Sequence, residues 1–72
     1  MRHDQYVLPN DDTWVVRDVN GSGKTRSFVS WMDAMCFART MAAKYRSQVI
    51  VFDDDMDIEN IESYAKKPDP PE

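Results

Sequence analysis

The chain has few of the residues from which small proteins build disulfides, membrane anchors or catalytic sites. Its only cysteine, Cys36, cannot form an internal disulfide, which suits a reducing compartment and predicts a cytoplasmic protein. No apolar run approaches the roughly 20 residues that cross a bilayer, so we expect no membrane partner. The only histidine, His3, lies in an N-terminus that we expect to fray.

Catalysis therefore has few candidate residues. Cys36 falls within a predicted helix, and no second histidine is present to act as its base. Nothing in the sequence identifies a concave pocket that would shift the pKa values of a pair of carboxyl groups. We predict that the protein is not an enzyme and carries no cofactor.

Charge is acidic overall and unevenly placed. Nine basic and thirteen acidic residues give a net charge of −4, which disfavours attraction to the phosphates of nucleic acid. Acidic residues gather between positions 53 and 62, whereas basic residues occupy the middle of the chain. The pattern favours a protein partner over a nucleic acid.

The first half of the chain predicts strands. Residues 5–8 read as an edge strand that ends at the turn-forming residues 9–12. Residues 13–19 are rich in β-branched and aromatic side chains, with Trp14 and Val16 on one face. The turn between the two segments predicts a hairpin, and residues 26–29 add a few extended residues.

The second half predicts one helix and two strands. Ser30, with Asp33 three residues later, resembles a capping box, and apolar residues at helical spacing continue to about residue 46. Residues 48–52 form a β-branched run typical of a buried strand, in which either the odd or the even positions face the core. Residues 58–64 fit a helical turn or a strand, and we favour the strand.

These elements predict an α+β fold in the order β-β-α-β-β, with an antiparallel sheet of three to four strands packed against one α-helix. Seventy-two residues leave room for one domain, which we place at 1–65. Residues 66–72 contain three of the four prolines and no apolar anchor, so we predict a flexible, acidic tail.

Two segments resemble ligand-binding loops only in part. Residues 21–25 match the end of a phosphate-binding loop, but Asp18 occupies the place of its first glycine and no helix follows directly. Asp53, Asp55 and Asp57 alternate as in a calcium loop, but Ile58 replaces its glycine and Tyr64 its bidentate glutamate. We interpret the first as a turn and the second as a solvated acidic turn, and we expect no metal.

Residues for partner binding are chosen by exposure and charge. Val15 and Arg17 project from the face of their strand opposite Trp14, and Phe37 lies off the helical core stripe. The acidic run could complement a basic partner, or serve only solubility. The predicted partner-binding residues are Val15, Arg17, Phe37, Arg46, Asp53, Asp54, Asp55, Lys66 and Lys67.

The order of these segments resembles a family of short uncharacterised bacterial domains over about residues 5–65. The resemblance lies in a strand containing Trp14-Val15-Val16-Arg17, an alanine-rich helix after Ser30, the Val49-Ile50-Val51 strand and a late Ser63-Tyr64 pair. It implies a small sheet backed by one helix, with no activity attached. The chain departs from that pattern by carrying residues 53–57, rich in aspartate, before its last strand.

The overall character of the chain also resembles the small transcription regulators of Xanthomonas bacteriophage. The shared features are its size, its single helix and its proline-rich end. The resemblance implies binding to the β′ subunit of host RNA polymerase in the host cytoplasm, inhibition of initiation, antitermination and cooperation with NusA, and assigns no numbered residue.

Two other functions stay open on the residues alone. The chain could be an acidic decoy that occupies the nucleic-acid site of a host protein, through residues 53–62. It could instead be a small nucleic-acid-binding module using Arg17, Lys24, Arg26 and Arg46, which the net charge disfavours. We expect a monomer, although an unpaired edge strand could pair with a partner or with a second copy.

Overall fold

A computed structural model describes residues 3–19 and 23–64 of the chain. Its elements are β1 (Asp4–Asn10), β2 (Thr13–Val19), β3 (Thr25–Phe28), α1 (Trp31–Tyr45), β4 (Gln48–Phe52) and β5 (Ile58–Ser63). The helix and all the predicted strands are therefore present, with ends within two residues of those expected for β2, α1 and β4. The tail at 66–72 and the boundary at 65 lie outside the described residues.

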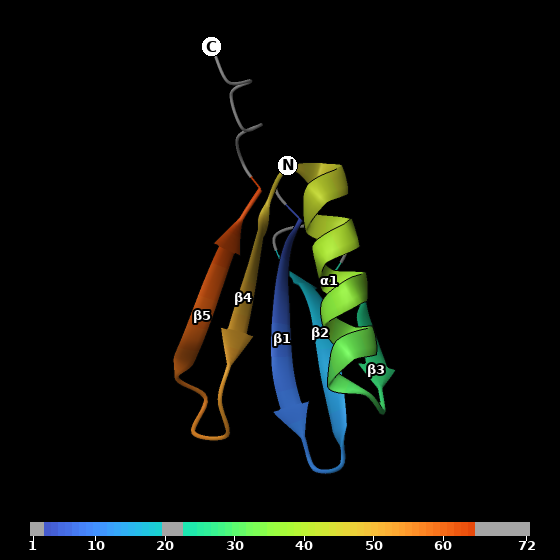
Figure 1. The fold of residues 1–72 in the computed structure, drawn as a ribbon, viewed down its shortest axis with the longest axis vertical. Coiled ribbons are helices and arrows are strands. Elements are labelled where there is room, and N and C mark those ends of the chain that lie inside the picture. The colour runs from blue at the N-terminus through green and yellow to red at the C-terminus, as the bar shows by residue number, and fades with distance from the viewer. Residues whose placement is uncertain (1–2, 20–22, 65–72) are drawn as a thin grey trace.

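The sheet has five strands in the order β3-β2-β1-β4-β5 (Figure 1). The β1–β2, β2–β3 and β4–β5 pairs are antiparallel, whereas β1 and β4 are parallel. The prediction of an antiparallel sheet with three to four strands was thus wrong in strand number and in part of its direction. The prediction that the first strand lies at an edge was also wrong, because the chain crosses through β3 and α1 and returns with β4 beside β1.

The helix begins and ends where its capping residues predict. The hydroxyl of Ser30 accepts a hydrogen bond from the backbone N–H of Asp33, and Arg46 closes the last turn in the left-handed conformation with φ 52°. The four fully or nearly buried helical residues lie at helical spacing and face the sheet: Ala34, Met35, Ala38 and Ala42. Three alanines in this stripe let the helix backbone approach the sheet closely.

The core lies between α1 and one face of the sheet. Val7, Val16, Val49 and Val51 are at most 2% exposed and pack beneath the helix. The odd positions of β4 therefore face the core, which resolves the two alternatives left open for that strand. Because α1 is the only helix among the described residues, it covers only one face of the sheet (Figure 1).

The last strand pairs back onto β4 as predicted. Ile50 lies opposite Ile61, and a bulge between Val51 and Phe52 shifts the register near the turn. The aspartate-rich segment makes that turn, and the backbone N–H of Asp53 donates to the carbonyl of Asp57 at 2.9 Å. The aspartate-rich segment, in which the chain departs from the family pattern, therefore forms a turn that leads into the final strand.

Candidate docking surface

The face of the sheet opposite α1 carries apolar side chains across its middle strands and β5. Strand register places alternate side chains on this side, because successive residues of a strand point to opposite faces. We call this surface the open face and define it by these residues: Tyr6, Leu8, Val15, Arg17, Val19, Ile50, Phe52, Ile58 and Ile61. Eight of these nine are apolar or aromatic. The same pairings place polar residues on this side at the β3 edge and near the strand ends: Asp4, Asn10, Thr13, Thr25, Ser27, Gln48 and Ser63.

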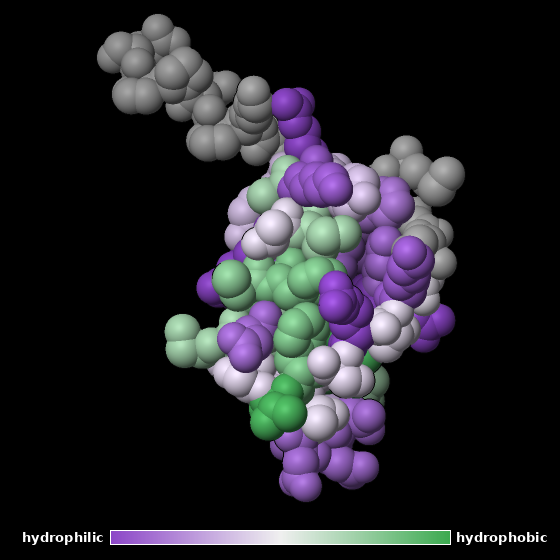
Figure 2. Space-filling view, turned by 90° about the vertical axis from the view of Figure 1, so that its right-hand side faces the viewer, coloured by the Kyte–Doolittle hydropathy of each residue, from purple (hydrophilic) through white to green (hydrophobic). Residues whose placement is uncertain are grey.

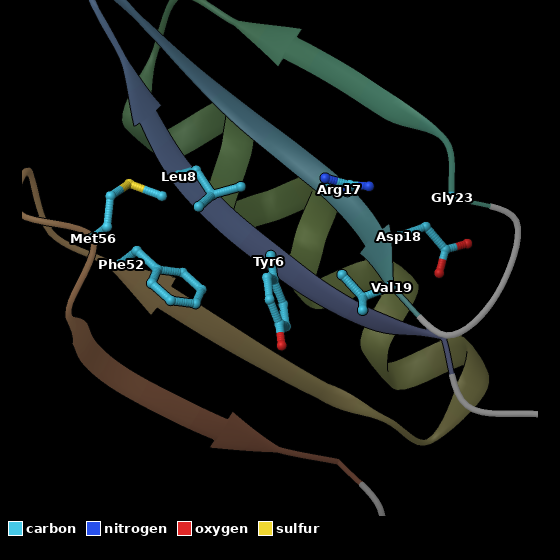
Figure 3. Close-up of a pocket in the computed structure, with 8 residues that line it drawn as sticks. All are labelled: Tyr6, Leu8, Arg17, Asp18, Val19, Gly23, Phe52 and Met56. Atoms are coloured by element: carbon cyan, nitrogen blue, oxygen red, sulfur yellow. The ribbon is translucent and has the colours of Figure 1, made fainter.

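A shallow hollow of about 500 Å³ lies on the open face (Figure 3). Tyr6 and Phe52 come from strands β1 and β4, and their ring centroids are 5.0 Å apart at a tilted angle. Leu8 lies on the same side of β1 as Tyr6, and Met56 from the β4–β5 turn lies beside Phe52 (Figure 3). The hollow is therefore walled by large side chains fixed on neighbouring strands.

Among the strand residues that point to this face, Arg17 is the only one that is both charged and exposed. It lies opposite Tyr6 across the β1–β2 pair. Among the described residues its guanidinium makes no hydrogen bond or ion pair. A guanidinium carries five N–H donors, so Arg17 has donors available for an anion from outside the chain.

Exposed apolar side chains extend the open face toward the β5 edge. Met56, Ile58 and Ile61 are 55%, 57% and 50% exposed. Single exposed apolar residues are ordinary, but a contiguous apolar surface on a small protein often marks an interaction site. The half-buried Tyr6, Leu8 and Phe52 make this surface continuous across the middle of the sheet.

Of the residues predicted to bind a partner, Val15 and Arg17 lie on the open face, as their alternation with Trp14 and Val16 predicted. Phe37 lies on the other side of the sheet. Its ring packs on Phe28 with centroids 5.4 Å apart, and Arg26 lies 5.1 Å above it in a cation–π contact. Phe37 therefore belongs to a different surface from Val15 and Arg17.

The side of the molecule that carries α1 and β3 has a second hollow, of about 600 Å³. Phe37 and Met41 line it from the helix, and Lys24 and Arg26 line it from β3 and the residue before it. Figure 2 shows this side as an apolar patch surrounded by hydrophilic residues. Its Arg26 guanidinium already contacts the Phe37 ring, whereas the described residues give Arg17 on the open face no such contact.

The predicted frayed state of His3 was wrong. Its Nδ1 lies 2.9 Å from Oδ2 of Asp18, and its ring stacks on Tyr45 with centroids 3.9 Å apart. The hydroxyl of Ser47 also donates to the backbone carbonyl of His3. The N-terminal part of β1 is thereby held to both β2 and the end of α1.

The acidic turn is shaped by one of its own carboxylates. Oδ1 of Asp53 accepts hydrogen bonds from the backbone N–H groups of Asp55 and Asp57, at 2.9 and 3.0 Å. Carboxylate oxygens of Asp53, Asp55 and Asp57 lie within 4.8 Å of one another. Asp53 thus has a local structural role in the turn, and Asp54 and Asp55 are exposed.

The basic residues considered for nucleic-acid binding do not form one patch. Arg17 lies on the open face, Arg26 projects to the helix side of the sheet, and Arg46 caps α1. Lys24 lies just before β3, in the segment 21–25 that resembled a phosphate-binding loop, of which residues 21 and 22 lie outside the described part. Lys66 and Lys67 also lie outside it.

Sequence reasoning did not find most of the open face. The strand patterns predicted only core or strand-forming roles for five of its residues: Tyr6, Leu8, Phe52, Ile58 and Ile61. One signal pointed to Phe52, because residues 49–52 are apolar at both odd and even positions, a pattern of strands that are covered on both faces. In the described structure only one of those faces is covered.

Comparison with known sequences places the chain in a family. Residues 5–64 match the sequence family described as "uncharacterized protein conserved in bacteria (DUF2188)". No curated protein and no solved structure shows significant similarity to the chain. None of the helices in the described residues is long and apolar enough to cross a membrane. Because the match covers most of the chain, the protein belongs to the DUF2188 family of bacterial domains.

Proposed function

We propose that this DUF2188 domain is a non-catalytic binding module whose open face docks on another protein. The supporting observation is the apolar surface that crosses the middle strands of the sheet. It carries Arg17, whose guanidinium has no hydrogen-bond or ion-pair partner among the described residues. Protein interfaces combine an apolar centre with aromatic residues and arginine, and Tyr6, Phe52 and Arg17 provide these groups together.

We further propose bacterial RNA polymerase as the partner, in the manner of a phage-type regulator. The support is the resemblance of the chain in size, single helix and proline-rich end to the small regulators of Xanthomonas bacteriophage. On that proposal the domain contacts the β′ subunit, inhibits transcription initiation and promotes antitermination together with NusA. A compact acidic module is suited to a basic polymerase surface, because complementary charge speeds association.

Capture of purified RNA polymerase by the immobilised full chain tests both parts of the proposal. The open-face variant combines Ile58→Ser and Ile61→Ser, which change exposed residues and should preserve the fold. Its matched control combines Val29→Ser, in the β3–α1 connection, with Met32→Ser on α1, and these residues are 83% and 76% exposed. We expect the wild type and the control to capture polymerase in the absence of DNA, and the open-face variant to lose capture.

The two parts fail separately in this experiment. Absence of capture by the wild type would refute the polymerase as partner. Equal capture by the open-face variant and the control would refute the open face as the docking surface. An in vitro transcription assay with the same three proteins then tests whether initiation and termination respond.

An acidic decoy is the second candidate function, and the exposed Asp54 and Asp55 beside Asp57 favour it. On this proposal the turn imitates the spaced phosphates of a nucleic acid. Asp54→Asn with Asp55→Asn should abolish inhibition of a nucleic-acid-binding target, because the effect depends on charge. Unchanged inhibition would exclude the decoy, and a mobility shift of DNA or RNA by the wild type at low salt would instead indicate direct nucleic-acid binding.

A further inference from the structure

We infer that the occupant of the open face is one amphipathic helix of a partner protein, about fifteen residues long, that presents a carboxylate to Arg17. This inference rests on the proposed function and adds the chemistry and shape of what docks. Three features of the open face support it: its dimensions, its charge and its relation to α1.

The dimensions of the sheet match a single helix. A strand of seven residues such as β1 is about 23 Å long at roughly 3.3 Å per residue. The helix on the opposite face, α1, has fifteen residues, which corresponds to about 22 Å at roughly 1.5 Å per residue. One helix of this length already covers the other side of the same strands, so a second helix of equal length would cover the open face.

The width of the apolar surface favours one helix over a second copy of the chain. Five strands about 4.8 Å apart give a face about 24 Å wide, or roughly 500 Å² of sheet, with shorter strands at its edges. Stable dimers bury about 800 Å² of accessible surface on each partner, so a second copy would need contacts that extend to the polar rim of this face. A helix about 10 Å in diameter, in contrast, spans the middle strands, where Tyr6, Leu8 and Phe52 lie.

The charge on the open face specifies an acidic group on the partner. Arg17 is flanked on its own strand face by Val15 and Val19 and faces Tyr6 on β1, so three of its four nearest neighbours on this face are apolar or aromatic, the fourth being Thr25 on β3. Covering it with a purely apolar helix would leave a desolvated charge, which is costly unless the charge is paired. Two copies stacked face to face would place two Arg17 side chains in one interface. The strand residues of that face would supply no exposed carboxylate to pair with them.

Selection from a displayed library of fifteen-residue peptides tests this inference. The full chain is labelled with a fluorescent maleimide at Cys36, which is exposed on α1 and therefore on the far side of the sheet from the open face. Three baits are used: the wild type, Arg17→Glu, and Arg26→Glu as a matched charge reversal on the helix side. Circular dichroism checks that all three baits are folded.

The wild type and Arg26→Glu should enrich peptides with apolar residues at positions i, i+3, i+4 and i+7 and one aspartate or glutamate beside that stripe. Arg17→Glu should enrich the same apolar pattern with lysine or arginine in place of the acid. An acid-bearing peptide should bind Arg17→Glu at least about ten-fold more weakly than the wild type, which is the effect of losing a charge-assisted hydrogen bond.

Three results would overturn the inference. Enrichment of peptides whose apolar residues alternate with polar ones would indicate that a strand adds to β3 or β5. If no peptide is enriched, a helical occupant is excluded. If Arg17→Glu still selects acidic peptides, the ion pair with Arg17 is excluded. None of these results affects capture of polymerase by the open face, so the proposed function stands or falls separately.

Discussion

Arg39 and Glu62 join the exposed side of α1 to the edge strand β5. The guanidinium donates two hydrogen bonds to the carboxylate, at 2.9 and 2.8 Å, in a bidentate pair. The hydroxyl of Tyr64 donates to the same carboxylate at 3.3 Å. Hydrogen bonding to Arg39 holds the pKa of Glu62 below its usual range and raises the pKa of Arg39, while burial raises the pKa of Tyr64.

The first prediction concerns the pH dependence of this ion pair. Because the pKa of Glu62 is lower in the folded than in the unfolded chain, its carboxylate stabilises the fold at pH values above the ordinary pKa of about 4.5. That stability is lost as the pH falls through the lowered pKa. Glu62→Gln should therefore lower the Tm modestly at pH 7, with the gap to the wild type closing as the pH falls below 4.5.

Thermal unfolding followed by circular dichroism between pH 3 and pH 8 measures this gap. Glu59→Gln is a suitable control, since Glu59 is an exposed acidic residue of the same strand. A gap that stays constant across the whole pH range would contradict the assignment to the Glu62 carboxylate.

Arg46 provides the second prediction, because its φ of 52° is in the left-handed region that favours glycine. Left-handed backbone costs an L-residue about 1–2 kcal/mol, and part of the gain from glycine is offset by its greater freedom in the unfolded chain. Arg46→Gly should therefore raise the free energy of unfolding by about 0.5–1 kcal/mol.

Urea denaturation tests the effect, with Arg46→Ala as the control that removes the charge and keeps the backbone strain. An equal gain from alanine would assign the effect to charge. Arg46 was also predicted to bind a partner, so polymerase capture by the more stable Arg46→Gly variant tests that role without a loss of fold.

At the scale of elements, the approach of α1 to the sheet yields the third prediction. Ala38 lies on the side of α1 that faces the sheet and is fully buried, one turn away from the equally buried Ala34 and Ala42. A larger side chain there must push the helix away from the sheet, and overpacking a core usually costs about 1–3 kcal/mol. Ala38→Leu should lower the free energy of unfolding by that amount, whereas Ala43→Leu, on the exposed side, should leave it nearly unchanged.

Local patterns in the sequence were sufficient to identify most elements. Ser30 predicted the start of α1, and the β-branched runs predicted β2 and β4, because capping and periodicity depend on neighbouring residues alone. The alternation of Trp14 and Val16 with Val15 and Arg17 also assigned the faces of β2 correctly. Contacts made by His3 were missed, since Asp18 and Tyr45 approach it only in the folded chain.

At the scale of the whole molecule, strand order and the candidate site depend on contacts between distant segments. The parallel pairing of β1 with β4 joins residues more than forty positions apart, and no local pattern records it. That pairing places Tyr6 beside Ile50 and brings its ring near Phe52, which creates the centre of the open face. Val15 and Arg17 were predicted as exposed binding residues, but the surface to which they belong could not be assembled without the sheet order.

Ionic strength gives the last prediction, because it separates apolar docking on the open face from docking through the acidic turn. The screening length falls from about 10 Å at 0.1 M salt to about 3 Å at 1 M, which weakens exposed charge pairs and leaves apolar contacts intact. Docking on the open face buries mainly apolar groups and Arg17, so the Kd for polymerase should change less than about three-fold over this range. Fluorescence anisotropy of the chain labelled at Cys36 measures that Kd. Two results together would instead make the acidic turn the docking surface: loss of binding by the wild type at 1 M salt, and loss of binding by the Asp54→Asn, Asp55→Asn variant at 0.1 M salt. A contact through that turn would consist mainly of exposed charge.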